Sequence, residues 1–204
     1  MILDPKFKLL NDINSLPKSN ELISIDTCVI LEIWGQHNTH DQSSICEEFI
    51  KNTSKNNNIL CITTKTFEEL TILTQSKTIP RNKFDFNKNP RFYLSNSNND
   101  VADLLNELNK LPNFYPEPVG SINSETLKQI TKNQVKHALK WGDSAIYTLN
   151  KSEDIHTICT LDGDWSHVDD SALTVLTTQN QIDKFISLKT QNPIIPIKQN
   201  ILLP

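Results

Sequence analysis

The stretch Glu21-Leu22-Ile23-Ser24-Ile25-Asp26-Thr27 decides the fold class, because it is a short apolar run that ends at an acid. Such a run is typical of a strand buried on both faces, as in parallel sheets. Comparable runs follow at 59–62, 155–161 and 172–176, and Asp162 follows the third of the four. Since helical patterns separate these runs, the sequence predicts an α/β fold with a parallel sheet covered on both faces.

Capping residues and apolar spacing predict the helices that connect these strands. They are expected at 27–33, 45–51, 64–73, 124–139, 143–149 and 181–188. A helical arm is also expected within 1–20, because Asp4 can cap a helix that has Pro5 in its first turn. Gly142 is expected to end one helix, so that Asp143 opens the next.

The length of 204 residues favours one domain spanning 1–204, with an insertion at 76–123 and a tail at 190–204. The formal net charge of −4 argues against a protein that coats nucleic acid over its whole surface, but it allows a local basic patch. The chain has no run of about 18 apolar residues, so no contact with a membrane is expected. Acids and lysines near the N-terminus do not fit a signal peptide. The four cysteines show no C-x-x-C spacing, and reduced thiols in the cytoplasm are expected.

Acidic residues follow the predicted strands or begin the helices between them. Asp26 follows the first strand, Asp162 and Asp164 follow the third, and Asp143 precedes that strand by one helix. Either Glu68 or Glu69 joins them from the helix after the second strand. Ligands bind beyond the carboxyl ends of parallel strands, so these carboxylates can converge on one crevice. Mg²⁺ and Mn²⁺ prefer oxygen ligands, and either ion would neutralise such a cluster.

Each acid also has an ordinary structural interpretation when it is taken alone. Asp26 or Asp143 would cap a helix, and Glu68 or Glu69 would be a solvated helix residue. Asp162-Gly163-Asp164 would be a turn. The order of all these contexts along one chain favours the metal-site hypothesis.

Four short motifs in this order resemble those of PIN-domain nucleases. They are Ile-Asp-Thr (25–27), Thr-Thr-Lys-Thr-Phe-Glu-Glu-Leu (63–70), Gly-Asp-Ser-Ala-Ile (142–146) and Thr-Leu-Asp-Gly-Asp-Trp (160–165). The resemblance implies that the catalytic, metal-binding acids are Asp26, Glu69, Asp143 and Asp162. It assigns supporting roles to Thr27 and Thr160, makes Asp164 an auxiliary metal-binding acid, and leaves Glu68 as a competitor of Glu69.

The resemblance also implies a three-layer α/β/α sandwich with a mainly parallel sheet of four to five strands. The implied activity is Mg²⁺- or Mn²⁺-dependent cleavage of RNA. Many small bacterial members are VapC-like toxins that form homodimers and are blocked by an antitoxin protein, and the tail could serve such contacts. Asp143 lies 74 positions after Glu69, a longer spacing than in a minimal toxin of this kind. The alternatives are a PIN-like DNA or RNA nuclease in defence or RNA processing, another fold with an acidic crevice such as a metal-dependent phosphatase, and a catalytically inactive PIN-like RNA-binding module.

The insertion contains the only two arginines of the chain. Arg81, Lys83, Lys88 and Arg91 lie there among several aromatic residues. Basic groups follow phosphates and aromatic rings stack on unpaired bases, so this segment is a candidate RNA-binding edge. The alternative is that its aromatic residues anchor a long loop and its basic residues solvate it.

Overall fold

The computed structural model describes residues 6–33, 40–76 and 106–191. Within them, five strands form one sheet in the order β1-β5-β4-β2-β3, and every neighbouring pair is parallel. The strands are β1 (Phe7–Leu9), β2 (Leu22–Ile25), β3 (Ile59–Cys61), β4 (Thr157–Cys159) and β5 (Thr174–Thr177). The parallel sheet predicted from the apolar runs is confirmed.

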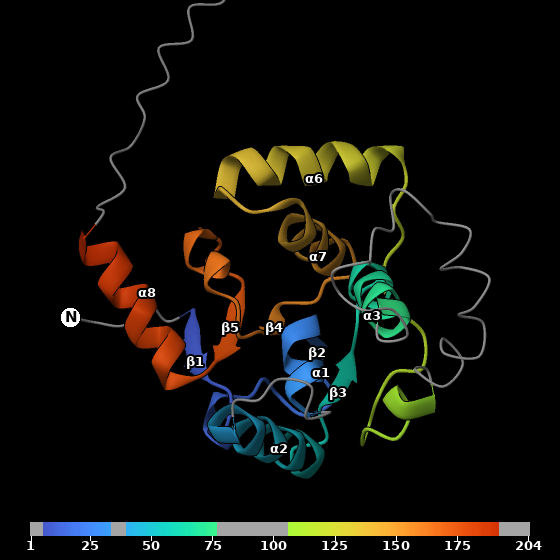
Figure 1. Cartoon of the computed structure of the whole chain (residues 1–204), viewed down its shortest axis with the longest axis vertical. Helices are drawn as coiled ribbons and strands as arrows, with labels where there is room; N and C mark the ends of the chain where they lie inside the picture. The colour runs from blue at the N-terminus through green and yellow to red at the C-terminus, as the bar shows by residue number, and fades with distance from the viewer. Residues whose placement is uncertain (1–5, 34–39, 77–105, 192–204) are drawn as a thin grey trace, which may run out of the picture.

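Helices lie on both sides of this sheet, so the fold is a three-layer α/β/α sandwich. The helices are α1 (Thr27–Ile33), α2 (His40–Lys55), α3 (Thr64–Ser76), α6 (Ser124–His137), α7 (Trp141–Ser152) and α8 (Gln179–Gln191). In Figure 1, α2 lies below the row of strands, whereas α7 and α6 lie above it. The predicted fold class is therefore confirmed.

The alternation of side chains along the central strands explains the two cores. In β4 and β5, Ile158 and Val175 point into a cluster formed with side chains of α7 and α8. Their neighbours Cys159 and Leu176 point to the opposite face, into a cluster formed with α1 and α2. Successive strand residues face opposite sides, so each strand contributes to both clusters.

The expected N-terminal helical arm is wrong, because residues 7–9 form the edge strand β1. Phe7 pairs with Val175 in β5, and the Leu10 N–H donates to the Thr177 carbonyl at 3.0 Å. The Phe7 ring is buried against Phe185, with the ring centroids 4.9 Å apart. Pairing with the edge of β5 provides hydrogen-bond partners for the backbone of residues 7–9, whereas a short isolated helix is only marginally stable. The tertiary contact therefore overrides the local capping signal.

Two predicted helix boundaries also differ from the structure. α2 is longer than the segment expected at 45–51. α6 ends at His137 because Ala138 adopts a left-handed conformation with φ of 51°, and Gly142 does not stop it. Gly142 instead lies in the first turn of α7, one residue before Asp143.

The last part of the insertion extends the sheet beyond β3. The Leu60 N–H donates to the Asn113 carbonyl at 3.0 Å, and the Tyr115 N–H donates to the Leu60 carbonyl at 2.7 Å. Val119 continues this pairing with Ile62 and Thr64. The segment covers the backbone groups of an exposed sheet edge, which would otherwise offer a surface for aggregation.

Neither the central part of the insertion at 77–105 nor the tail at 192–204 is among the described residues. No helix in the described part of the chain combines the length and the apolar character needed to cross a membrane.

Candidate metal-binding site

Asp26 lies immediately after β2, where the strand turns into α1. The Thr27 N–H donates to its Oδ1 at 2.7 Å, and the Thr160 hydroxyl donates to its Oδ2 at 2.6 Å. The Cys28 thiol contacts Oδ2 at 3.5 Å. Burial nevertheless raises the pKa of Asp26 to about 6, with the charge of Glu69 adding to the effect and the hydrogen bonds opposing it. The carboxyl group is thus held in one orientation at the floor of the site.

Glu69 reaches the same place from α3. Its Oε2 accepts a hydrogen bond from the Thr27 hydroxyl at 2.7 Å, and its Oε1 lies 3.7 Å from the Lys65 ammonium. Glu68 instead pairs with Lys65 at 3.1 Å and has a side chain that is 52% exposed. Of the two predicted candidates, Glu69 is therefore the one that faces Asp26.

Asp143 lies in the first turn of α7, and its partly buried carboxylate accepts no hydrogen bond from the described residues. Burial, together with the negative charges of Asp26, Asp162 and Asp164, raises its pKa to about 7. Lys140 contributes a smaller effect in the opposite direction. Since the helix begins at Trp141, Asp143 does not act as the cap that its sequence context suggested.

Asp162 and Asp164 follow β4 in a short 3₁₀ turn at Gly163–His167. The Asp164 N–H donates to Asp162 Oδ1 at 3.0 Å, so Asp162 caps this turn as well as facing the site. Carboxylate oxygens of Asp143, Asp162 and Asp164 all lie within 4.8 Å of one another. The capping interpretation and the metal-site interpretation of Asp162 are therefore compatible.

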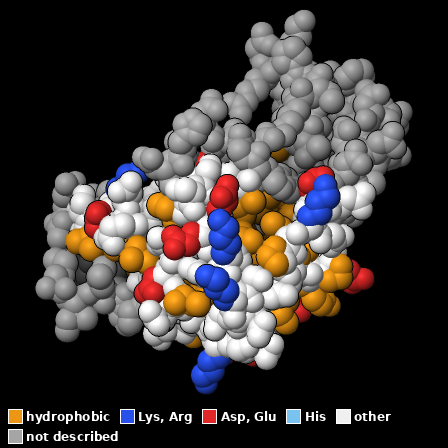
Figure 2. All heavy atoms as spheres, turned by 90° about the horizontal axis from the view of Figure 1, so that it is seen from below, with side chains coloured by type: hydrophobic (Ala, Val, Ile, Leu, Met, Phe, Trp, Pro, Cys, Tyr) orange, Lys and Arg blue, Asp and Glu red, His pale blue; other side chains and the backbone are white. Residues whose placement is uncertain are grey.

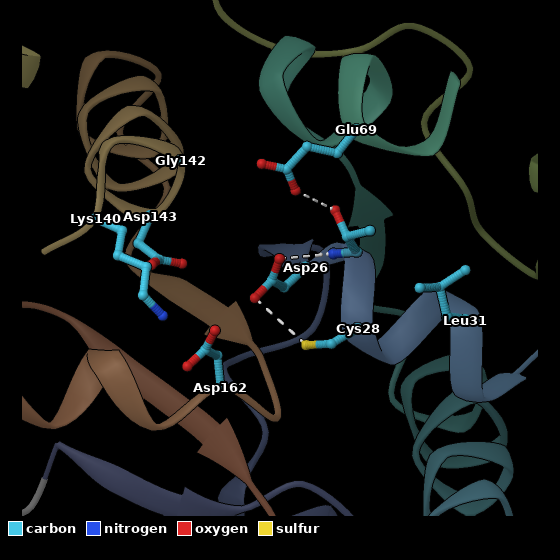
Figure 3. Close-up of a pocket in the computed structure, with 9 residues that line it drawn as sticks. Asp26, Cys28, Leu31, Glu69, Lys140, Gly142, Asp143 and Asp162 are labelled. Atoms are coloured by element: carbon cyan, nitrogen blue, oxygen red, sulfur yellow. Dashed lines mark hydrogen bonds between the residues drawn. The ribbon is translucent and has the colours of Figure 1, made fainter. Parts of the chain in front are cut away.

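All four predicted acids line one open cavity at the carboxyl end of the sheet. Its volume is about 390 Å³. Figure 3 shows Asp26, Glu69, Asp143 and Asp162 pointing toward the cavity from two helices and two strand ends. The lining residues are Asp26, Thr27, Cys28, Leu31, Glu69, Lys140, Gly142, Asp143 and Asp162.

The donor set fits a hard divalent cation. It consists of carboxylate oxygens, and no hydrogen-bond donor among the described residues competes with a metal for the Asp143 carboxylate. Among the described lining residues, Cys28 alone carries a soft ligand atom, and burial raises the pKa of its thiol well above the usual value. A protonated thiol is a poor metal ligand, so the chemistry of the site favours Mg²⁺ or Mn²⁺ over a thiophilic ion.

Two supporting residues lie where the sequence motifs suggested. Thr160 and Thr27 contact Asp26 and Glu69 directly, as described above. The predicted RNA-binding residues Arg81, Lys83, Lys88 and Arg91 lie outside the described residues.

Three residues at the site were not predicted from the sequence as site residues, namely Lys140, Gly142 and Lys65. A Cβ on Gly142 would lie 2.9 Å from Glu69 Oε1, so the glycine lets α7 approach α3 closely. The Lys65 ammonium lies 4.9 Å from the centroid of the Trp141 ring, in addition to its contacts with both glutamates. The available signal was proximity in the sequence, because Gly142 directly precedes Asp143 and Lys140 lies three residues before it.

Comparison with known proteins identifies no family. No protein-family model matches the chain, and a search of curated proteins finds no similar sequence. The residues of the site therefore provide the basis for inferring a function.

Proposed function

We propose that this protein is a metal-dependent nuclease that hydrolyses phosphodiester bonds of RNA, with Mg²⁺ or Mn²⁺ as its cofactor. The observation that carries the proposal is the convergence of Asp26, Glu69, Asp143 and Asp162 on one cavity. These residues come from four separate segments of the chain, and their meeting has no simple explanation in helix capping alone. The same four positions carry the resemblance to PIN-domain nucleases.

The acids of the site would have different roles, with the aspartates binding the metal and Glu69 acting on the water. Asp143, Asp162 and Asp164 are close enough to hold one ion, and Asp26 faces them across the cavity (Figure 3). A divalent cation bound there would activate water and stabilise the charge that develops on the cleaved phosphate. Glu69 is oriented by the Thr27 hydroxyl at 2.7 Å and would accept a proton from an attacking water.

The cavity is open enough to admit a phosphodiester backbone. The described residues supply one cation at its lining, Lys140, whose side chain is 75% exposed. The face of the molecule in Figure 2 intersperses lysines with acidic side chains and shows no extended basic surface on its described residues. We infer that further contacts to RNA come from elsewhere, with the basic residues of the 76–123 insertion as candidates. The antitoxin partner and the homodimer also remain proposals that rest on the resemblance.

Cleavage of labelled single-stranded RNA with Mn²⁺ or EDTA tests the function. We expect cleavage that requires the metal and is reduced at least about 100-fold in Asp26→Asn and Asp143→Asn. Asp154→Asn is the matched control, because that carboxylate is 94% exposed and, in the described part of the chain, pairs only with His156 at the surface. Equal cleavage by all four proteins would reject the proposal, and cleavage of DNA alone would favour the DNA nuclease alternative.

A further inference from the structure

Lys140 occupies a position that the helix it precedes does not favour. It is the N-cap residue of α7 and makes no side-chain capping hydrogen bond. Side chains that accept hydrogen bonds are preferred there, and the positive end of the helix dipole disfavours a cation. A residue that breaks a local rule without a local gain points to another role.

The three carboxylates of the metal-site cluster explain its position. The Lys140 ammonium lies 2.8 Å from Asp164 Oδ2, and the side chain lines the cavity together with Asp143 and Asp162. In Figure 3 its amine end points toward the gap between those two aspartates. Asp164, Asp162 and Asp143 all raise the pKa of Lys140, so the ammonium is held in its charged form.

We propose that Lys140 is a tethered counter-cation of this site, which neutralises the clustered aspartates when no metal is bound and competes with a divalent cation for Asp164. The inference rests on the proposed function, because it assumes that the cluster binds a metal. The lysine side chain is exposed and flexible, so a cation can displace it without unfolding α7.

If Lys140 has this role, removal of its ammonium should have opposite effects on the stability of the metal-free protein and on the affinity for Mn²⁺. Removal of the ammonium leaves the aspartates to repel one another in the metal-free protein, which should lower its thermal stability at pH 8. The same change removes a competitor, so Mn²⁺ should bind more tightly. A residue with a merely structural role would not improve metal binding while it destabilised the fold.

The chain offers a matched control on the same helix. Lys151 pairs with Asp170 at 2.9 Å, and its side chain is 60% exposed, but this pair lines a different, small cavity with Tyr147. Lys140→Met and Lys151→Met therefore each remove one exposed lysine from one lysine–aspartate pair. Lys140→Arg keeps the charge and serves as the conservative variant.

Titration of the full-length protein with Mn²⁺ alone, by calorimetry at pH 8 and low salt, tests the inference. We expect Lys140→Met to lower the Mn²⁺ dissociation constant about three- to tenfold, with a smaller difference at high salt. Lys151→Met and Lys140→Arg should remain within about twofold of the wild type. The melting temperature of metal-free Lys140→Met should fall at the same pH.

The outcomes separate this inference from the proposed function. If Mn²⁺ binds equally to the wild type and Lys140→Met, the role of Lys140 is overturned and the metal site stands. If neither protein binds Mn²⁺, both proposals are overturned. If only Lys140→Met binds Mn²⁺ detectably, competition by the lysine is supported directly.

Discussion

Asp26 and Asp143 are both aspartates of one site, but the structure holds them in different ways. Asp26 is buried and accepts hydrogen bonds from Thr27 and Thr160, which favour its charged form. Asp143 lacks such donors among the described residues and faces three other carboxylates. Its pKa is accordingly raised to about 7, against about 6 for Asp26. Asp143 is therefore the acid whose charge is most costly in the metal-free protein.

Asp143→Asn should stabilise the metal-free protein at high pH. With a folded-state pKa of about 7 against 3.8 when unfolded, the folded state binds more protons between pH 4 and pH 7. The free energy of unfolding of the wild type should therefore fall as pH rises through this range. Asparagine does not ionise, so the variant should gain about 1–2 kcal/mol at pH 8, allowing for solvent screening.

Thermal denaturation in EDTA at pH 5 and pH 8 measures this difference. The melting temperature of Asp143→Asn should exceed that of the wild type by a few degrees at pH 8, and the gap should narrow at pH 5. Asp154→Asn provides the surface control. A gap that is the same at both pH values would contradict the raised pKa of Asp143.

At the scale of the elements, the approach of α7 to α3 forms the site. Gly142 lies where the first turn of α7 passes Glu69, and Ser144, two residues later, anchors α7 by donating to the Ile130 carbonyl at 2.7 Å. The start of α7 thus packs against α6 on one side and α3 on the other.

Gly142→Ala should weaken Mn²⁺ binding severalfold without weakening the fold. The added Cβ would lie 2.9 Å from Glu69 Oε1, so the Glu69 carboxylate has to shift, and we expect this shift to disturb the hydrogen bond between Glu69 Oε2 and Thr27. Alanine is the better helix former by about 1 kcal/mol, so the melting temperature should stay the same or rise. Calorimetry with Mn²⁺ and thermal denaturation measure the two effects.

Gly163→Ala is the matched control for this substitution. Its added Cβ would meet only Phe185 at 3.8 Å, an ordinary contact. Affinity for Mn²⁺ that falls equally in both variants would show that close packing against Glu69 is not the cause.

Asn123→Ala should destabilise α6 and leave the site intact. The Asn123 side chain accepts hydrogen bonds from the N–H groups of Glu125 and Thr126, at 3.0 and 2.9 Å. Loss of this cap should cost about 1 kcal/mol, or a decrease of about 2–4 °C in melting temperature. Unchanged Mn²⁺ affinity in the same variant would separate helix stability from the function of the site, whereas an unchanged melting temperature would contradict the capping role.

At the scale of the whole molecule, metal binding and stability should be coupled. A ligand that binds only the folded state raises the free energy of unfolding, and a metal must displace protons from the carboxylates it binds. We expect Mn²⁺ to raise the melting temperature more at pH 8 than at pH 6, because Asp143 is mostly protonated at pH 6. Deprotonation of Asp143 alone should change the apparent affinity for Mn²⁺ about tenfold between these two pH values.

Thermal denaturation with and without Mn²⁺ at the two pH values tests this coupling. In Asp143→Asn, the increase in melting temperature caused by Mn²⁺ should be much smaller at both pH values. A larger increase at pH 6 than at pH 8 in the wild type would contradict proton displacement from Asp143.

The sequence by itself determined the sheet and most of the candidate site. The apolar runs 21–26, 59–62 and 155–161 can be buried on both faces only in a sheet covered by helices, and the acids that follow strands share its carboxyl edge. Residue spacing was sufficient here because the alternation along each strand fixes the direction of its side chains, and parallel pairing places the carboxyl ends of the strands at the same edge of the sheet.

Tertiary structure decided what depends on contacts between distant segments. Residues 7–9 became a strand because the edge of β5 was available to pair with them, and no local signal encodes that edge. Glu69 was distinguished from Glu68 by the Thr27 hydroxyl, 42 residues away in the chain. The place of Lys140 beside Asp164 likewise required the turn after β4 to meet the start of α7, since charge pairing acts through space and leaves no pattern in the sequence.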